Sequence, residues 1–144
     1  MPSPAASLTR RVTFAAAHRY RRPEWDDERN ERTFGLCARP SFHGHSYVCE
    51  VTVRGPIDPL TGFCVDLALL DRVLATEVRE RFDHRNVNLD VPEFADGRLV
   101  PTGENLARFV FERVQAALGG AVRVVEVTVA EDETLRCTYR GDDG

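Results

Sequence analysis

The sequence contains no apolar run that approaches the ~20 residues of a membrane-spanning helix. The stretch that comes nearest, Val122–Val129, carries Arg123 and Glu126, so we expect no membrane partner. The first seven residues, Met1–Ser7, lack the apolar core of an export signal, and we expect them to form a short flexible tail. These two absences predict a cytoplasmic protein.

The chain also lacks an excess of basic residues, with 19 Lys and Arg against 23 Asp and Glu and a net charge of −4. A protein that binds nucleic acid through its phosphates is normally basic, so nucleic acid is disfavoured as the main partner. The Gly-rich motifs of dinucleotide and P-loop sites are absent as well. No CxxC pair occurs, and a reducing compartment then predicts free thiols at all four cysteines. These are Cys37, Cys49, Cys64 and Cys137.

What the chain does contain fits one globular domain, which we place at residues 8–141: it has 144 residues, of which 42% are hydrophobic. Alternating patterns predict strands over 8–18, 43–54, 121–131 and 135–140. Apolar residues about one helical turn apart predict helices over 66–82, with Asp66 as N-cap, and over 103–118. The order ββααββ predicts an α+β fold, with an antiparallel four-stranded sheet and two helices on one face. The charged segment 19–35 is expected to be a long irregular loop.

Three of the four histidines are predicted to converge on one side of this sheet. In the triplet His43-Gly44-His45, residues two apart on a strand point to the same face. His18 ends the preceding strand, which a hairpin-like pairing brings alongside. Three imidazoles suit Zn²⁺ and leave its fourth position open, as in catalytic sites. The alternative is that these are strand histidines without a metal.

Other residues able to carry out acid–base chemistry lie in loops. Cys37 comes six residues before His43, and Arg39 nearby favours a lowered thiol pKa and a role in proton transfer. The alternative is a buried, inert thiol. Asp83 next to His84 matches a base with its orienting carboxylate, although a histidine at a helix C-terminus is also favoured by the helix dipole alone.

Glu131 continues the apolar parity of Val125, Val127 and Val129 at the end of a predicted strand. A carboxylate on an inward face must be paired or must bind something, and the planar amino-imine edge of a guanine or pterin ring satisfies both of its oxygens. The alternative is a strand-end glutamate that reaches solvent. Thr102 and Glu104, at the start of the second long helix, are most simply capping and dipole residues.

Seven short segments occur in the order in which they occur in a known family. The chain resembles the 6-pyruvoyl-tetrahydropterin synthase family, which also includes the 6-carboxy-tetrahydropterin synthases of queuosine synthesis. The resemblance covers about residues 8–141, nearly the whole chain. The segments are Phe14–His18, Asn30–Cys37, His43–Tyr47, Gly62–Asp66, Phe82–Asn86, Pro101–Asn105, and Glu131 with Tyr139 eight residues later.

The resemblance implies the tetrahydrobiopterin-synthesis fold (T-fold). Three ββααββ subunits of that family close a barrel, two trimers stack into a hexamer, and the active sites lie between subunits. The residues that it implies are His18, His43 and His45 for zinc, Cys37, Asp83 and His84 for proton transfer, and Glu131, Thr102 and Glu104 for the pterin.

The implied reaction converts 7,8-dihydroneopterin triphosphate to 6-pyruvoyl-tetrahydropterin with loss of triphosphate. Zinc would bind the side-chain hydroxyls of the substrate and stabilise the developing negative charge. Hydrogen is rearranged within the substrate, so no external redox cofactor is needed. The alternative is the carboxy-type reaction on the same substrate, which releases acetaldehyde. The five residues between Cys37 and His43 and the long insertion at 25–35 favour the pyruvoyl type.

Two positions depart from the family pattern. Phe42 stands where pyruvoyl members usually have glycine, and Asp132 replaces a common threonine. Both bear on side-chain specificity more than on the zinc site. Two other function classes remain: a zinc- and pterin-binding protein without turnover, and a zinc hydrolase of another small molecule. Cys37, Asp83 and His84 argue against the first, because binding alone needs none of them.

Overall fold

The computed structural model describes residues 3–141, so Met1 and Pro2 of the expected tail lie outside the described range. Two long strands come first, and a short helix and a 3-10 turn lie between them. Helices and short elements follow, and a hairpin ends the described chain. The elements are β1 (Ala5–His18), α1 (Asp27–Phe34), a 3-10 turn (Gly35–Ala38), β2 (His43–Pro56), α2 (Leu67–Leu74), a π-helical turn (Ala75–Arg79), α3 (Glu80–Phe82), β3 (Arg85–Asn86), α4 (Val87–Asp90), a second 3-10 turn (Pro92–Phe94), α5 (Gly103–Leu118), β4 (Arg123–Asp132) and β5 (Leu135–Tyr139).

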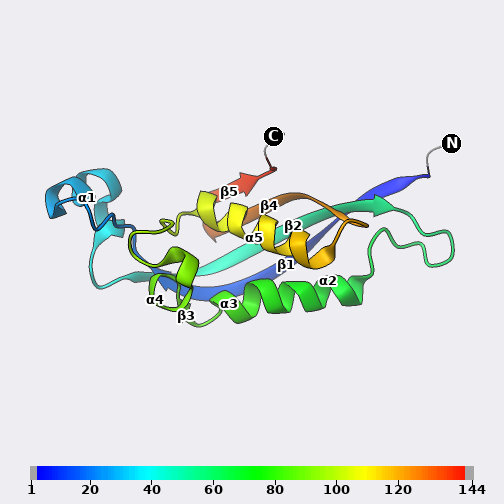
Figure 1. Ribbon diagram of the computed structural model, residues 1–144, viewed down its shortest axis with the longest axis horizontal. Coiled ribbons are helices and arrows are strands. Elements are labelled where there is room, and N and C mark those ends of the chain that lie inside the picture. Colours follow the sequence, from blue (N-terminus) through cyan, green and yellow to red (C-terminus); the bar gives the residue numbers. More distant parts are fainter. Residues whose placement is uncertain (1–2, 142–144) are drawn as a thin grey trace.

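The predicted α+β architecture is confirmed, with a correction to the number of strands. The sheet has five strands in the order β3-β1-β2-β4-β5, not four. The additional strand, β3, runs parallel to β1 beside Ala16 and Ala17. Two residues are too few to give an alternating pattern, which is why the sequence does not predict this strand. As expected, α2, α3 and α5 cover one face of the sheet, whereas α1 projects at one end (Figure 1).

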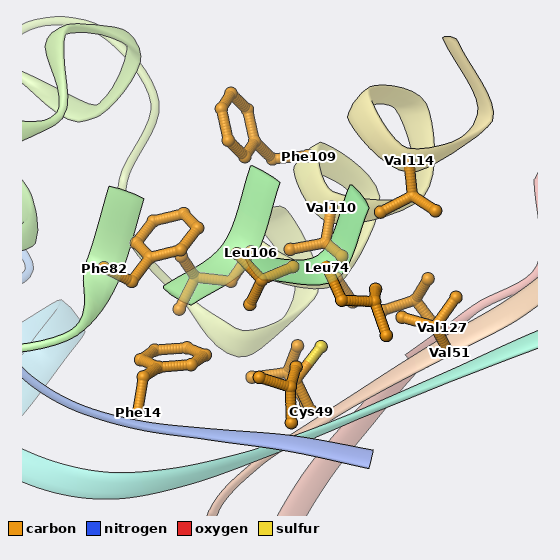
Figure 2. Close-up of a cluster of buried hydrophobic side chains, with 14 of the residues drawn as sticks. Phe14, Cys49, Val51, Leu74, Phe82, Leu106, Phe109, Val110, Val114 and Val127 are labelled. Carbon is orange, nitrogen blue, oxygen red and sulfur yellow. The ribbon is translucent and has the colours of Figure 1, made fainter. Parts of the chain in front are cut away.

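The core lies between these helices and the sheet (Figure 2). Phe14 of β1 stacks against Tyr47 of β2 and Phe82 of α3, with ring centroids 4.8 and 5.3 Å apart. Further residues of the buried cluster are Cys49, Val51, Leu70, Leu74, Val78, Leu106, Val110, Val114, Val127 and Val129. Packing against the helices therefore fixes β1 and β2 in the core as far as Tyr47, which lies only two residues from His45.

The helix predicted over 66–82 forms, but it is not α-helical throughout. Asp66 caps it as expected, because its carboxylate accepts hydrogen bonds from the amides of Ala68 and Leu69 at 3.0 and 3.2 Å. Its buried residues include those at 70, 74, 78 and 82, which are spaced by four. That spacing drifts around an α-helix of ~3.6 residues per turn, and a wider π turn takes up the drift.

Three other details differ from the sequence-based expectation. β1 begins at Ala5, so the last three residues of the expected tail pair with β2. The segment predicted as an irregular loop contains α1 and a 3-10 turn. A register shift beside Thr52 buries Val124 in place of the expected Val125.

The sheet face opposite the helices is open and polar. Thr9 and Thr52 share a hydrogen bond of 2.7 Å between their hydroxyls, as do Thr128 and Thr138 at 2.8 Å. None of the helices in residues 3–141 has the length and apolar character needed to cross a membrane. Association of the sheet with other subunits stays a prediction.

Candidate active site

The three histidines predicted to bind a metal lie together where β1 ends and β2 begins. His18 is the cross-strand partner of His43, and His45 lies two residues further on the same face. One nitrogen from each ring can be chosen so that all three atoms lie within 4.8 Å of one another. The ring centroids are 4.6 to 5.1 Å apart. This geometry is what a single small cation requires of three imidazole ligands.

The ring of His18 is fully buried and held by a backbone contact. Its Nδ1 lies 3.0 Å from the carbonyl oxygen of Pro101, which can only accept, so this contact favours the tautomer with the proton on Nδ1. The lone pair of Nε2 is then left for a ligand, the usual arrangement of a metal-binding histidine. Burial, together with nearby His43, lowers the pKa of His18 to about 3, and burial also lowers the pKa of His43. Both rings are therefore neutral and able to coordinate a metal.

His45 gives the sharpest test of whether a metal fits this cluster. Its Nε2 is buried and has no hydrogen-bond partner among residues 3–141. The nearest carboxylate oxygen, Oε2 of Glu131, is 3.8 Å away, beyond hydrogen-bond distance. A buried nitrogen without a partner is costly, and coordination of a cation removes that cost. The residues present therefore fit a bound metal ion.

Cys37 lies in the 3-10 turn that precedes β2, and it is partly buried. Its carbonyl oxygen accepts a hydrogen bond of 2.7 Å from the amide of Tyr20, so the turn is tied to the segment that follows His18. The expectation that Arg39 lowers the pKa of the Cys37 thiol is wrong for the folded chain. Burial raises the pKa of Cys37, and the negative charge of Glu131 raises it further.

Asp83 and His84 form the pair that the sequence predicts, but the pair lies at the edge of the sheet, where it hydrogen-bonds the backbone of Ala15 in β1. His84 Nδ1 is 3.1 Å from Asp83 Oδ1, and the His84 side chain is exposed. The hydrogen bonds found within residues 3–141 include none between His84 and Cys37. An open cavity of about 520 Å³ is lined by both His84 and His45. One chain thus places the pair beside a predicted metal ligand but not beside the thiol.

Three acceptor residues predicted for a ring ligand lie near α5 and the end of β4. Glu131 is only 9% exposed, and its Oε1 accepts a hydrogen bond of 2.6 Å from the hydroxyl of Tyr20. Thr102 caps α5 by accepting from the amide of Asn105, as the capping interpretation predicts. Glu104 is exposed in the first turn of α5, and its Oε1 accepts from Cys137 Sγ at 3.1 Å.

Three residues of the site are not predicted by sequence reasoning. Tyr20 follows His18 in a segment without periodicity, so no pattern singles it out. Tyr47 shares the parity of the histidine triplet, and its hydroxyl lies 3.0 Å from His18 Nδ1. Cys137, predicted as a free thiol, lies half-buried against Glu104. Burial and the bond to Glu104 raise its pKa to about 12, so it remains a thiol at neutral pH.

Comparison with known proteins places this arrangement among related sequences and structures. A family model described as 6-pyruvoyl tetrahydropterin synthase matches residues 7–142. The chain is 38% identical to the human 6-pyruvoyl tetrahydrobiopterin synthase over 137 residues, which cover 95% of this chain and 92% of the relative. It is 38% identical to the Drosophila melanogaster enzyme of that name, over 96% of this chain and 81% of the relative. The solved Caenorhabditis elegans 6-pyruvoyl tetrahydropterin synthase superposes with a TM-score of 0.90 at 33% identity, over 99% of each chain.

Proposed function

We propose that this chain, which belongs to the 6-pyruvoyl tetrahydropterin synthase family, is a zinc-dependent lyase acting on 7,8-dihydroneopterin triphosphate. The products are 6-pyruvoyl-tetrahydropterin and triphosphate. The observation that carries the proposal is the cluster of three imidazoles, with the unpartnered Nε2 of His45, beside the carboxylate of Glu131. A metal ligand set and a ring acceptor in one place match a substrate that has both a polar tail and a heterocycle.

His18, His43 and His45 hold the metal in this proposal. All three are neutral donors, so they leave the full charge of the ion in place and one coordination position open. When bound, zinc supplies a Lewis acid that polarises an oxygen of the substrate tail. Pro101 fixes the tautomer of His18 through its carbonyl oxygen, which keeps Nε2 aimed at the cluster.

Glu131 binds the pterin ring. Its carboxylate accepts hydrogen bonds from the ring amino group and the adjacent ring N–H, and a charged acceptor makes these bonds strong. Glu104 and Thr102 lie at the N-terminus of α5, where Glu104 is accessible to a ligand. Orientation of the ring in this way places the tail of the substrate toward the histidines.

Cys37 and the pair Asp83–His84 transfer protons between the side-chain carbons and the ring. The hydrogens lost from the side chain appear on the reduced ring, and triphosphate leaves by elimination, so no external redox agent enters the balance. Because His84 does not contact Cys37 within one chain, His84 of one subunit serves Cys37 of another. The exposed position of His84 at the edge of the sheet supports this sharing.

The assembly we propose is a hexamer built from two trimers, and the compartment is the cytoplasm. The open polar face of the sheet and the position of β5 as its last strand within residues 3–141 favour closure of the sheet with other subunits. Light scattering on the purified protein measures the assembly directly. A monomer at micromolar concentration would remove both the barrel and the shared site.

Product analysis tests the reaction. We expect the zinc-loaded protein to convert 7,8-dihydroneopterin triphosphate to 6-pyruvoyl-tetrahydropterin and triphosphate, identified by mass. Acetaldehyde release would instead identify the carboxy-type reaction. Pterin binding without triphosphate release would indicate a binding protein. Turnover of an ester but not of the pterin would indicate a zinc hydrolase.

A further inference from the structure

Tyr20 connects three groups of the candidate site that come from different elements. Its hydroxyl donates to Oε1 of Glu131 at 2.6 Å, and its amide donates to the carbonyl oxygen of Cys37 at 2.7 Å. Its ring packs edge-on against His18, with the centroids 4.8 Å apart. The Tyr20 ring also packs edge-on against Phe34 of α1, with the ring centroids 5.9 Å apart. One residue thus contacts a metal ligand, the thiol turn and the ring acceptor.

The position of Glu131 makes the hydroxyl of Tyr20 important. The other oxygen of this carboxylate, Oε2, lies 3.8 Å from Nε2 of His45. A cation in the histidine cluster attracts a nearby carboxylate, because the two charges are close in a poorly solvated place. When His45 coordinates a metal, its Nε2 has no proton to donate to Glu131. The bond from Tyr20 then opposes rotation of the carboxylate toward the cation.

We propose that Tyr20 is a positioning residue that holds the Glu131 carboxylate in the orientation that accepts the pterin ring. The inference rests on the function proposed above and deepens it. Each carboxylate oxygen has two lone pairs, so Oε1 accepts from Tyr20 and from a ring donor at the same time. Tyr20 touches no reacting atom and acts through Glu131.

The variant Tyr20→Phe removes only the hydroxyl. The ring packing against His18 and the amide bond to Cys37 remain, so the fold and the metal site are conserved. We expect zinc content to stay near that of the unchanged protein and the equilibrium affinity for 7,8-dihydroneopterin to fall on the order of 10-fold. Affinity is measured by pterin fluorescence on zinc-loaded protein, without turnover. An affinity that is unchanged or tighter overturns the proposal.

A double-mutant cycle shows whether Tyr20 acts through Glu131. In the Glu131→Gln background, Tyr20→Phe is expected to change pterin affinity less than twofold, because the charged acceptor is already gone. Glu126→Gln is the matched control, since Glu126 lies on the same strand and pairs with Arg140 at 2.9 Å. In that background the loss on the order of 10-fold persists. Equal losses in both backgrounds overturn the proposal.

The cycle also separates this inference from the proposed function. If the wild-type protein binds no pterin at all, the proposed function is contradicted and the role of Tyr20 with it. If the wild-type protein binds pterin but the variants show no coupling between positions 20 and 131, the function stands and only the role of Tyr20 is removed. For turnover, the positioning role predicts a raised KM with kcat changed much less.

Discussion

The carboxylate of Asp83 accepts a hydrogen bond of 2.9 Å from the backbone amide of Ala15. The same oxygen, Oδ1, lies 3.1 Å from Nδ1 of His84, and the His84 amide donates to the Ala15 carbonyl at 2.6 Å. Ala15 precedes His18 by three residues on β1. The strand that carries a predicted metal ligand therefore also fixes the predicted proton-transfer pair.

This relationship predicts different effects for two substitutions of Asp83. Asp83→Ala leaves the Ala15 amide without its acceptor, whereas Asp83→Asn keeps an oxygen at that place. We expect the alanine variant to have the lower melting temperature of the two, and both to lose turnover, because neither carries the charge that orients His84. Thermal unfolding measures the first effect. Equal melting temperatures would show that the bond to Ala15 does not matter for stability.

His43→Ala is expected to remove most of the bound zinc, because two remaining imidazoles hold the ion much less tightly than three. The measurement is metal per chain after dialysis against a weak chelator. His84→Ala is the control: this histidine is exposed and lies outside the cluster, so its variant keeps a full complement. Full zinc content in the His43 variant would refute the ligand assignment.

Cys37→Ala is expected to keep zinc and pterin binding but to lower turnover by roughly 10²- to 10⁴-fold, the usual contribution of a positioned acid or base. Triphosphate release under saturating substrate gives the rate. Cys64→Ala, which removes another partly buried thiol, should retain the rate. The role of Cys37 fails if its variant turns over as fast as that control.

The metal-free protein is expected to become less stable as the pH is lowered, because of His18. Its pKa is lowered from 6.5 to about 3, mainly by burial. Above pH 6.5, the pKa of His18 in the unfolded chain, this side chain is neutral in both the folded and the unfolded state. His18 then adds no pH dependence to the free energy of unfolding. Below pH 6.5, the unfolded chain takes up a proton at His18 that the folded chain does not, and this contribution alone decreases the free energy of unfolding by about 1.4 kcal/mol per pH unit until the folded pKa is reached.

Denaturant titrations in chelator, at several values between about pH 7 and pH 4, measure this slope. A stability that does not change over this range would mean that His18 is protonated in the folded protein.

Phe42 offers a test of backbone strain next to the site. Its φ is 63°, in the left-handed region where a side chain is unfavourable, and its ring lies under the Arg19 guanidinium at 4.7 Å. Phe42→Gly and Phe42→Ala both lose that contact, but only glycine is relaxed in this conformation. We expect the glycine variant to be more stable than the alanine variant by about 1 kcal/mol. Denaturant unfolding of the two variants decides; alanine at least as stable as glycine would exclude strain at this position.

The sequence predicts those parts of the molecule that have a strong period. Alternation on β1 and β2 placed His18 opposite His43, and the capping residue Asp66 marked the start of α2. The helix α1 has no apolar stripe, and its one buried residue is Asn30, whose side chain bonds the backbone of Arg22 at 2.8 and 3.0 Å. Such a helix depends on polar contacts with its neighbours, which no periodicity records.

The site shows the same division. His43 and His45 lie two residues apart on a strand, so their spacing alone predicts that they point to the same face. Tyr20 cannot be placed in this way, because its contacts depend on how the chain turns after β1 and on β4, more than a hundred positions away in the sequence. The roles of individual residues in proton transfer and ring binding stay predictions until the variants are measured.

The hairpin of β1 and β2 pairs continuously from Ala5–Pro56 to His18–His43. A slip of one residue would turn every side chain of β1 to the opposite surface, so His18 would point away from its two companions. A metal ion bound by all three imidazoles would stabilise only the strand register in which the three rings converge. Metal binding would then favour the correct pairing of β1 with β2 during folding, in addition to its part in chemistry.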